Sequence, residues 1–249
     1  MDKQEIIFRD IGLMDYQAAW DYQEELLQEN VRRKSLTSSQ QPASPVTSIA
    51  ECPLTTAHYL LFVEHPPVYT LGKSGNKENV LLNDDGLKEK NIQFFNTNRG
   101  GDITFHGPGQ IVGYPILDLE KFYTDVGKYL RNLEEVIILT MAEYGIAGDR
   151  SSGETGVWIE AGVQGRERKI CAIGVRCSRW ITMHGFAFNV NTDLSYFNHI
   201  IPCGIVNKQV TSLEKELGYK LDMDEVKEKV KKNFAKVFDA ELMIMGNGQ

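Results

Sequence analysis

The sequence predicts a single α+β domain, residues 1–249, with a mixed β-sheet flanked by helices. Helical patterns stand near both ends of the chain and once in its middle, and short β-like runs occupy the stretches between them. These runs do not alternate regularly with helices, as they would in a doubly wound parallel sheet. With 249 residues, of which 42% are hydrophobic, the chain is long enough to build a sizeable core.

The N-terminal part begins with a strand expected over residues 5–9 and a helix expected over 13–30, where apolar side chains recur along one side. Residues 35–48 then hold seven Ser or Thr and two Pro. Such a segment buries too little surface to offset its ordering entropy, so we expect a flexible surface loop over 31–57. Further β-like runs follow at 59–65, 66–72, 93–97, 103–105 and 110–119.

The C-terminal half opens with a helix predicted over 126–144, because apolar residues repeat there at spacings of three and four before Gly145. Next come β-like runs at 156–160, 168–177 and 185–190, with an extended piece at 180–183. Thr211 and Glu214 have capping-box spacing, and Asp222 precedes an amphipathic run that ends at Phe238. Two C-terminal helices are therefore expected.

Composition excludes several classes of protein. A net charge of −7 argues against broad nucleic-acid binding, which needs a basic surface. No stretch approaches the roughly 20 apolar residues of a membrane span, and the N-terminus lacks a signal or transit pattern, so we expect a cytoplasmic protein. The four cysteines have no metal-ligand spacing and are too few for a disulfide scaffold, so most are expected to be free and no metal site is predicted: Cys52, Cys171, Cys177 and Cys203.

The stretch from Arg99 to Gln110 has the composition of a binding loop, with four Gly, one Pro, one Arg and one His in twelve residues. Glycine lets a ligand approach the backbone closely, and proline fixes a turn. A hairpin turn with a solvated Arg and a packed His is the structural alternative, and composition leaves both open. The stretch matches neither a P-loop nor a dinucleotide fingerprint, so phosphate binding is poorly supported.

Lys169 heads a second stretch, which continues through an otherwise apolar row. In an extended run, the period of two places Lys169, Cys171 and Ile173 on one face. A buried lysine is partly neutral and can act as a base, whereas a lysine at a strand end more often extends its ammonium group to solvent. The spacing alone favours the second interpretation.

Cys203 lies between Pro202 and Gly204, at a sharp backbone turn that can present a thiol at a surface. A structural cysteine more often lies inside an apolar run, as Cys171 does. The pattern therefore makes Cys203 a candidate nucleophile beside the alternative of simple packing. His106, His184 and His199 remain candidate partners for a Cys–His pair.

Five stretches together resemble the motif series of the lipoyl(octanoyl) transferases: EHPPVYTLG (64–72), RGGDITFHGPGQ (99–110), KICAIGV (169–175), HGFAFNV (184–190) and IPCG (201–204). The resemblance covers about residues 58–217 in the family's order. It implies the fold shared by lipoate and biotin protein ligases, which is similar to that of class II aminoacyl-tRNA synthetases. It also implies an acyltransferase that moves an octanoyl group through a thioester.

Carried over motif by motif, the resemblance makes Cys203 the nucleophile and Lys169 its partner. The acyl pocket would be lined by three segments, in which small residues leave room for the chain: Arg99, Gly100, Gly101, Asp102, Ile103, Thr104, Phe105 and His106; Ala172, Ile173 and Gly174; and Gly185, Phe186 and Ala187. Backbone amides of the 99–109 loop or near Gly204 are candidate donors to the oxyanion.

The implied donor is octanoyl-acyl carrier protein. The implied acceptors are the lipoyl domains of 2-oxoacid dehydrogenase acyltransferase subunits and the glycine cleavage H protein, and no cofactor is implied. Because acyl carrier protein is acidic, we expect a local basic patch formed by Arg166, Arg168, Arg176 and Arg179. The alternatives are an ATP-dependent lipoate or biotin protein ligase of the same fold and a non-catalytic carrier-binding module.

Overall fold

The computed structural model describes residues 3–39, 55–201 and 209–244. Its larger sheet is mixed, as the sequence predicts, and runs β10-β8-β9-β6-β2-β1-β11 with β7 paired to β8. Strand β1 is parallel to β2 and β11, β8 is parallel to β10, and the other pairs are antiparallel. The strands are β1 (Gln4–Leu13), β2 (His58–Glu64), β6 (Gln110–Ile116), β7 (Val157–Ile159), β8 (Arg168–Ser178), β9 (Ile181–Asn189), β10 (Gln209–Val210) and β11 (Ala240–Ile244).

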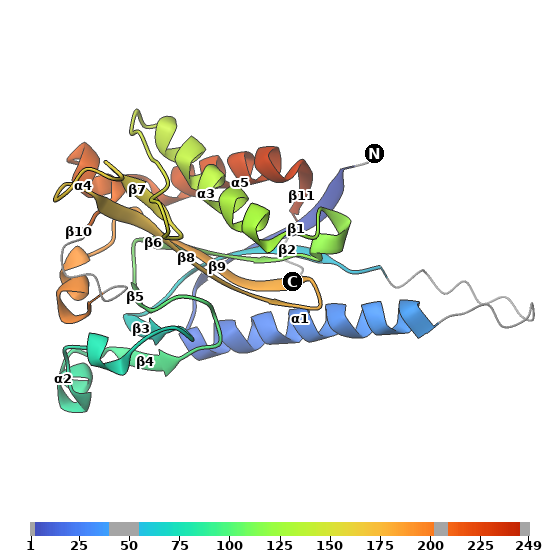
Figure 1. Ribbon diagram of the computed structural model, residues 1–249, viewed down its shortest axis with the longest axis horizontal. Helices are drawn as coiled ribbons and strands as arrows, with labels where there is room; N and C mark the ends of the chain where they lie inside the picture. Colours follow the sequence, from blue (N-terminus) through green and yellow to red (C-terminus); the bar gives the residue numbers. More distant parts are fainter. Residues whose placement is uncertain (1–2, 40–54, 202–208, 245–249) are drawn as a thin grey trace, which may run out of the picture.

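A smaller sheet, in the order β4-β3-β5, lies beside the larger one (Figure 1). It consists of β3 (Val68–Leu71), β4 (Gln93–Asn96) and β5 (Ile103–His106). The short helix α2 (Asp84–Glu89) and the 3₁₀ helices η1 (Lys77–Asn79) and η3 (Leu194–His199) surround it. Its own apolar cluster includes Tyr69, Ile103 and Phe105.

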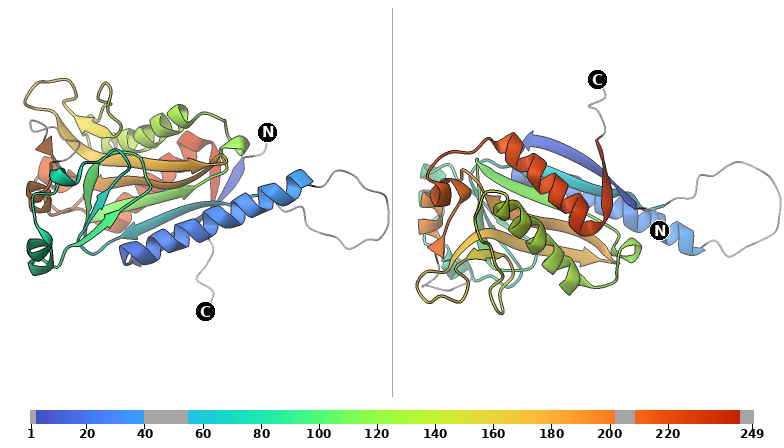
Figure 2. Two further views of the ribbon diagram at one scale, coloured as in Figure 1. Left: turned by 60° about the horizontal axis from the view of Figure 1, so that its bottom comes forward. Right: turned by 90° about the horizontal axis from the view of Figure 1, so that it is seen from above.

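Helices cover both faces of the larger sheet (Figures 1 and 2). Helix α1 (Tyr16–Ser39) packs on one face, while α3 (Val126–Ala142) and α5 (Met223–Phe238) pack on the other. The remaining short elements are α4 (Leu213–Leu217) and η2 (Leu119–Lys121). None of the helices in the described ranges combines the length and apolarity that crossing a membrane requires.

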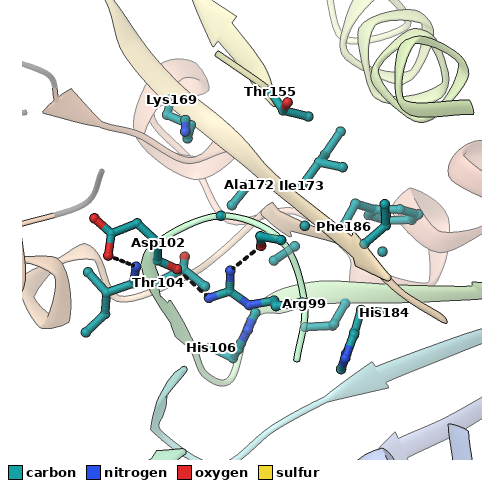
Figure 3. A pocket seen from close by; sticks show the side chains of 18 of the residues that line it. Arg99, Asp102, Thr104, His106, Thr155, Lys169, Ala172, Ile173, His184 and Phe186 are labelled. Carbon is teal, nitrogen blue, oxygen red and sulfur yellow. Dashed lines mark hydrogen bonds between the residues drawn. The ribbon is translucent and has the colours of Figure 1, made fainter. Parts of the chain in front are cut away.

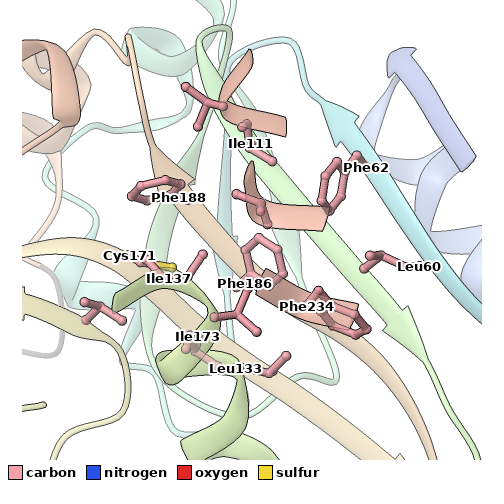
Figure 4. Close-up of a cluster of buried hydrophobic side chains, with 14 of the residues drawn as sticks. Leu60, Phe62, Ile111, Leu133, Ile137, Cys171, Ile173, Phe186, Phe188 and Phe234 are labelled. Carbon is pink, nitrogen blue, oxygen red and sulfur yellow. The ribbon is translucent and has the colours of Figure 1, made fainter. Parts of the chain in front are cut away.

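The main core lies between the larger sheet and helices α3 and α5 (Figure 4). Leu133 and Ile137 of α3 and Phe234 of α5 meet Phe186 and Phe188 of β9 there, and all five are at most 2% exposed. Each such side chain contributes about 1.5–3 kcal/mol on burial. This core therefore supports β8 and β9 along one face of the larger sheet.

Local sequence signals explain most helix boundaries. Asp125 caps α3 by accepting a hydrogen bond from the Lys128 N–H at 2.9 Å, and α3 ends just before Gly145, which has a φ of +74°. Asp222 caps α5, as predicted. The predicted cap of α4 is wrong by one residue, because Ser212, not Thr211, accepts the hydrogen bond from Lys215.

Two predictions in the N-terminal and central parts need correction. The flexible loop predicted over 31–57 is wrong for 31–39, where α1 continues to Ser39; residues 40–54 lie outside the described residues. Residues 181–183 of the predicted extended piece belong to β9, which is continuous with the following run. Arg179 and Trp180, with φ of +50° and +66°, form the two-residue turn that joins β8 to β9. Strand β11 was not predicted.

Candidate active site

A cavity of about 480 Å³ lies where the small sheet meets β8 and β9 (Figure 3). Pockets of this size, about 300–1,000 Å³, are typical of small-molecule sites. The cavity is lined by Lys169 and by every residue predicted for the acyl pocket except Phe105. The fold therefore brings together three segments that are far apart in the sequence.

Phe105 is the exception, and its side chain points to the face of β5 opposite to that of Thr104 and His106. Its ring is 1% exposed and stacks on Tyr196 with ring centroids 4.5 Å apart, inside the cluster of the small sheet. Thr104 and His106 line the cavity instead. The prediction that Phe105 lines the acyl pocket is wrong.

Arg99 holds the 99–103 loop against the small sheet. Its Nη2 donates to the Thr70 carbonyl oxygen at 2.6 Å, to Thr70 Oγ1 at 2.9 Å and to the Asp102 carbonyl oxygen at 2.8 Å. The residue is only 7% exposed. The hairpin alternative with a solvated Arg is therefore wrong. The buried guanidinium group instead links the loop to the small sheet in the cavity wall.

The glycines of the predicted pocket allow close backbone approach. A Cβ on Gly174 would lie 2.6 Å from the Gly100 carbonyl oxygen, and one on Gly185 would lie 2.1 Å from the Gly113 carbonyl oxygen. Gly174 thus lets the 99–103 loop lie directly on β8, where the Gly100 N–H donates to the Val175 carbonyl oxygen at 2.9 Å. Gly174 and Gly185 thus serve close packing between segments while they also line the cavity, and their role in leaving room for an acyl chain stays a prediction.

Lys169 faces the cavity because β8 contains a β-bulge. Across β7, Val157 pairs with Cys171 whereas the next residue, Trp158, pairs with Lys169. One extra residue, Ile170, is thereby inserted in β8. Cys171 and Val157 lie in the main core, whereas Lys169 lines the cavity and its Nζ lies 4.5 Å from the centroid of the Trp158 ring. The predicted single face for Lys169 and Cys171 is wrong at the bulge.

Two candidate histidines also line the cavity, and both are buried. Burial lowers the pKa of His184 to about 3, and burial also holds the pKa of His106 well below its usual value. Both rings are therefore neutral near pH 7. His106 is engaged through both nitrogens, with Gln110 Oε1 at 2.9 Å and Thr70 Oγ1 at 3.3 Å, and His184 Nε2 lies 2.7 Å from Asn98 Oδ1.

Sequence reasoning missed several cavity residues. Tyr16 of α1, Tyr114 of β6, Leu130 of α3 and Thr155 before β7 all line it. Tyr16 lies on the apolar side of its predicted helix, where a core position is the ordinary expectation. No local pattern distinguishes the residues of a ligand cavity from those of a core at such positions.

Two amides of the predicted loop are already hydrogen bonded. The Gly100 N–H donates to Val175, and the Gly109 N–H donates to Glu64 Oε2 at 2.8 Å. These two groups are therefore already engaged by acceptors within the fold.

Cys203 lies outside the described residues. The chain on either side of it reaches the cavity, since both Phe197 and Val210 line the wall. Val210 pairs with Lys169 across β10 and β8, and the Thr211 N–H donates to the Lys169 carbonyl oxygen at 2.9 Å. Within the described part of the chain, no group of three or more His, Cys, Asp or Glu side chains is arranged to hold a metal ion.

The four arginines predicted as a basic patch do not form one. Arg168 and Arg176 lie toward opposite ends of β8, about 26 Å apart at roughly 3.3 Å per residue. Arg166 and Arg168 both pair with Glu160, and Arg176 Nη1 lies 2.7 Å from Glu24 Oε2. Much of their charge is thus compensated within the fold.

Comparison with known proteins identifies the family. The model of the lipoyl protein ligase A/B catalytic domain matches residues 15–235. The chain is 55% identical to the octanoyltransferase of Christiangramia forsetii over 96% of this chain and 98% of that protein. It is 57% identical to the octanoyltransferase of Flavobacterium johnsoniae over 96% of this chain and 99% of that protein.

Solved structures support the fold assignment. A lipoate-protein ligase A bound with ATP has a TM-score of 0.64 at 13% identity, covering 98% of this chain and 89% of that one. The bi-partite lipoate protein ligase of Thermoplasma acidophilum also has a TM-score of 0.64, at 15% identity, covering 98% and 87%. At such identities the likeness concerns the fold alone. The sequence relatives are more specific, and they show that this chain belongs to the octanoyltransferase family of the lipoyl protein ligase A/B catalytic domain.

Proposed function

We propose that this chain, as one catalytic domain, transfers an octanoyl group from octanoyl-acyl carrier protein to a lysine of a lipoyl domain through a thioester on Cys203. The proposed acceptors are the lipoyl domains of 2-oxoacid dehydrogenase acyltransferase subunits and the glycine cleavage H protein. The observation that carries the proposal is the cavity of about 480 Å³, which is lined by Lys169 and by the segments on both sides of Cys203.

The cavity wall suits a fatty chain. Side chains of Val112, Leu130, Ile173 and Phe186 give it an apolar lining. An octanoyl chain has about six methylenes, and burial of each is worth about 0.8 kcal/mol, so the chain contributes on the order of 5 kcal/mol to binding. The Arg99 loop and the tight contact of Gly174 fix the shape of this wall.

The first half of the reaction loads the enzyme. The Cys203 thiol gives its proton to the Lys169 amine, and the thiolate attacks the thioester carbonyl carbon of the donor. The new carbon–sulfur bond to Cys203 forms as the bond to the carrier sulfur breaks. The departing carrier thiolate takes a proton from the Lys169 ammonium group, which restores the amine. Because one thioester replaces another, this half is nearly isoenergetic.

The second half releases the product. The amine of the acceptor lysine attacks the octanoyl-Cys203 carbonyl carbon, and Lys169 accepts a proton from that nitrogen. The carbon–sulfur bond then breaks, and the Cys203 thiolate is reprotonated by Lys169. Formation of an amide from a thioester is downhill, so no nucleotide is needed.

Intact mass spectrometry after incubation with octanoyl-acyl carrier protein tests the proposal. We expect one octanoyl adduct, sensitive to hydroxylamine, in the wild type and in Cys177→Ser, whose cysteine is free and half-buried away from the cavity. Cys203→Ser should carry none. An active wild-type enzyme without an adduct would refute the covalent route. Pyrophosphate release that depends on free octanoic acid would instead support the ATP-dependent ligase alternative.

A further inference from the structure

Outside the proposed reacting pair, strand β7 packs against the end of β8 that carries Lys169. Strand β7 runs antiparallel to the lysine end of β8, and Trp158 stands directly opposite Lys169. Side chains of directly opposed residues in an antiparallel pair lie on the same face. The Lys169 Nζ lies 4.5 Å from the Trp158 ring centroid, inside the roughly 6 Å at which a ring attracts a cation.

The Trp158 ring is held rigidly. The residue is 2% exposed. Its backbone is bound to Asp149 in both directions, because the Trp158 N–H donates to the Asp149 carbonyl oxygen at 2.9 Å and the Trp158 carbonyl oxygen accepts from the Asp149 N–H at 2.8 Å. A side chain on such a short, doubly paired strand presents a fixed surface to its neighbour.

A buried carboxylate anchors the start of the same strand. Glu134 of α3 is fully buried, and its Oε1 accepts a hydrogen bond from the Gly156 N–H at 3.0 Å. Gly156 has a φ of +128°, and a Cβ there would lie 2.6 Å from the Cys171 carbonyl oxygen and 3.5 Å from Lys169 Cε. The aliphatic part of the Lys169 side chain thus lies between the backbone of Gly156, which has no side chain, and the ring of Trp158.

We propose that Trp158 is a positioning residue for Lys169, whose ammonium form is held on the ring face toward the cavity. The inference rests on the proposed function, in which Lys169 becomes an ammonium ion when the Cys203 thiol loses its proton. That ion forms in a partly buried site, and the negative face of a tryptophan ring stabilises it there. The β-bulge at Ile170 serves the same end, because it turns Lys169 out of the core row and onto Trp158.

The test is a ladder of substitutions read by the single-turnover rate of Cys203 octanoylation. Trp158→Tyr and Trp158→Phe keep a ring, whereas Trp158→Leu keeps an apolar side chain without one. We expect Trp158→Leu to lower the rate roughly 5- to 30-fold, the span that corresponds to a desolvated cation–π contact, and the ring variants to recover much of that loss. The KM for the carrier protein should stay unchanged. Equal rates in the Leu and Phe variants would overturn the proposal.

A double-mutant cycle separates positioning from packing. In a Lys169→Met background, Trp158→Leu should lower the residual octanoylation rate by less than about 2-fold, because the ammonium group on which the ring acts is gone. A loss of the same size in both backgrounds would mean that Trp158 merely packs. Lys169→Met alone reports on the proposed function: a wild-type rate there would refute the role of Lys169 independently of the Trp158 ladder.

A matched control guards against loss of fold. Val157→Ala removes core volume from the same strand, on the face away from Lys169. We expect it to lower the temperature of unfolding and to leave the octanoylation rate unchanged. If Trp158→Leu does not fold, Trp158→Phe, whose ring attracts a cation less strongly than indole does, is compared with the wild type in both Lys169 backgrounds. A rate loss with Lys169 that disappears in the Lys169→Met background supports the proposal, and equal losses in both backgrounds overturn it.

Discussion

Arg99 donates from one nitrogen, Nη2, to both the carbonyl and the hydroxyl oxygen of Thr70, at 2.6 and 2.9 Å. Thr70 lies on β3 and is fully buried, so this contact ties the cavity loop to the small sheet. Thr70 Oγ1 in turn lies 3.3 Å from His106 Nε2, and the opposite ring nitrogen lies 2.9 Å from Gln110 Oε1. The shape of one cavity wall therefore depends on a single planar cation.

Arg99→Lys should damage both stability and octanoyl transfer. A lysine keeps the charge but loses the planar fork, whose Nη2 reaches three acceptors while Nη1 donates to the Gly100 carbonyl oxygen at 3.0 Å. We expect the free energy of unfolding to fall by about 1–3 kcal/mol, because buried carbonyl oxygens lose their donors, and the octanoylation rate to fall at least about 10-fold. Urea unfolding and single-turnover assays measure the two effects. Arg32→Lys, at an exposed ion pair with Glu29, should change neither; equal behaviour of the two variants would contradict this role of Arg99.

Gly174→Ala should detach the 99–103 loop from β8. The new Cβ would lie 2.6 Å from the Gly100 carbonyl oxygen and 3.2 Å from Arg99 Cδ, so backbone must move. Overpacking of this kind costs about 1–3 kcal/mol. Gly100→Ala is the matched stability control, since its Cβ would meet only the Val175 carbonyl oxygen at 3.4 Å. Chemical unfolding should give Gly174→Ala a clearly lower free energy of unfolding than Gly100→Ala, and the reverse order would contradict the prediction.

The sequence motifs correctly predicted which segments lie together at one cavity, but they did not predict the structural role of each residue. The Gly-rich and Lys-headed stretches do line one cavity, because their composition is that of chains that approach each other closely. Whether Gly174 makes room for a ligand or for a neighbouring backbone depends on which residue it contacts. That residue is Gly100, which is far from Gly174 in the sequence. Composition contains no information on that partner.

The side-chain direction of Lys169 could not be predicted from periodicity for a similar reason. A period of two assigns Lys169 and Cys171 to one face only if the strand is regular. The bulge at Ile170 is set by pairing with β7, some ten residues earlier in the chain, where Trp158 opposes Lys169. The apolar side chains of Ile170 and Cys171 both reach the core as a result.

The length of α1 shows the same limit at long range. Residues 31–39 are mostly polar, and their composition predicted a loop. Yet Lys34 Nζ lies 2.9 Å from Asp118 Oδ1 and donates to the Arg179 carbonyl oxygen at 2.9 Å. Asp118 is 1% exposed, so the pair is partly shielded from solvent and fixes the end of the helix on the sheet. Contacts between residues 34, 118 and 179 cannot be predicted from the local sequence pattern.

Glu134→Gln should weaken the anchor of β7. The buried carboxylate accepts from Gly156, and its Oε2 lies 3.0 Å from Arg150 Nε and 2.7 Å from Arg131 Nη1. Neutralising it removes the compensation of two partly exposed arginines, so we expect a loss of about 1–3 kcal/mol in the free energy of unfolding. Glu135→Gln, at a carboxylate that is 39% exposed and pairs with Arg150, should lose less than about 1 kcal/mol. Denaturant titrations of the two variants that coincide would contradict the prediction.

The stability of the fold should fall between about pH 6.5 and pH 4, in part because of His58. Burial, opposed by the charge of Asp118, lowers the pKa of His58 to about 4. In this pH window the unfolded chain binds a proton that the folded chain excludes, so each pH unit of acidification removes about 1.4 kcal/mol per such histidine. His58→Asn keeps an acceptor for the Asp118 N–H, which His58 Nδ1 accepts at 3.2 Å, and has no titrating group. Its free energy of unfolding should therefore decline less steeply than that of the wild type on acidification.

The difference between the two curves isolates His58 from every other titrating group, and curves that stay parallel from pH 7 to pH 4 would mean that the buried ring already accepts a proton in the folded state.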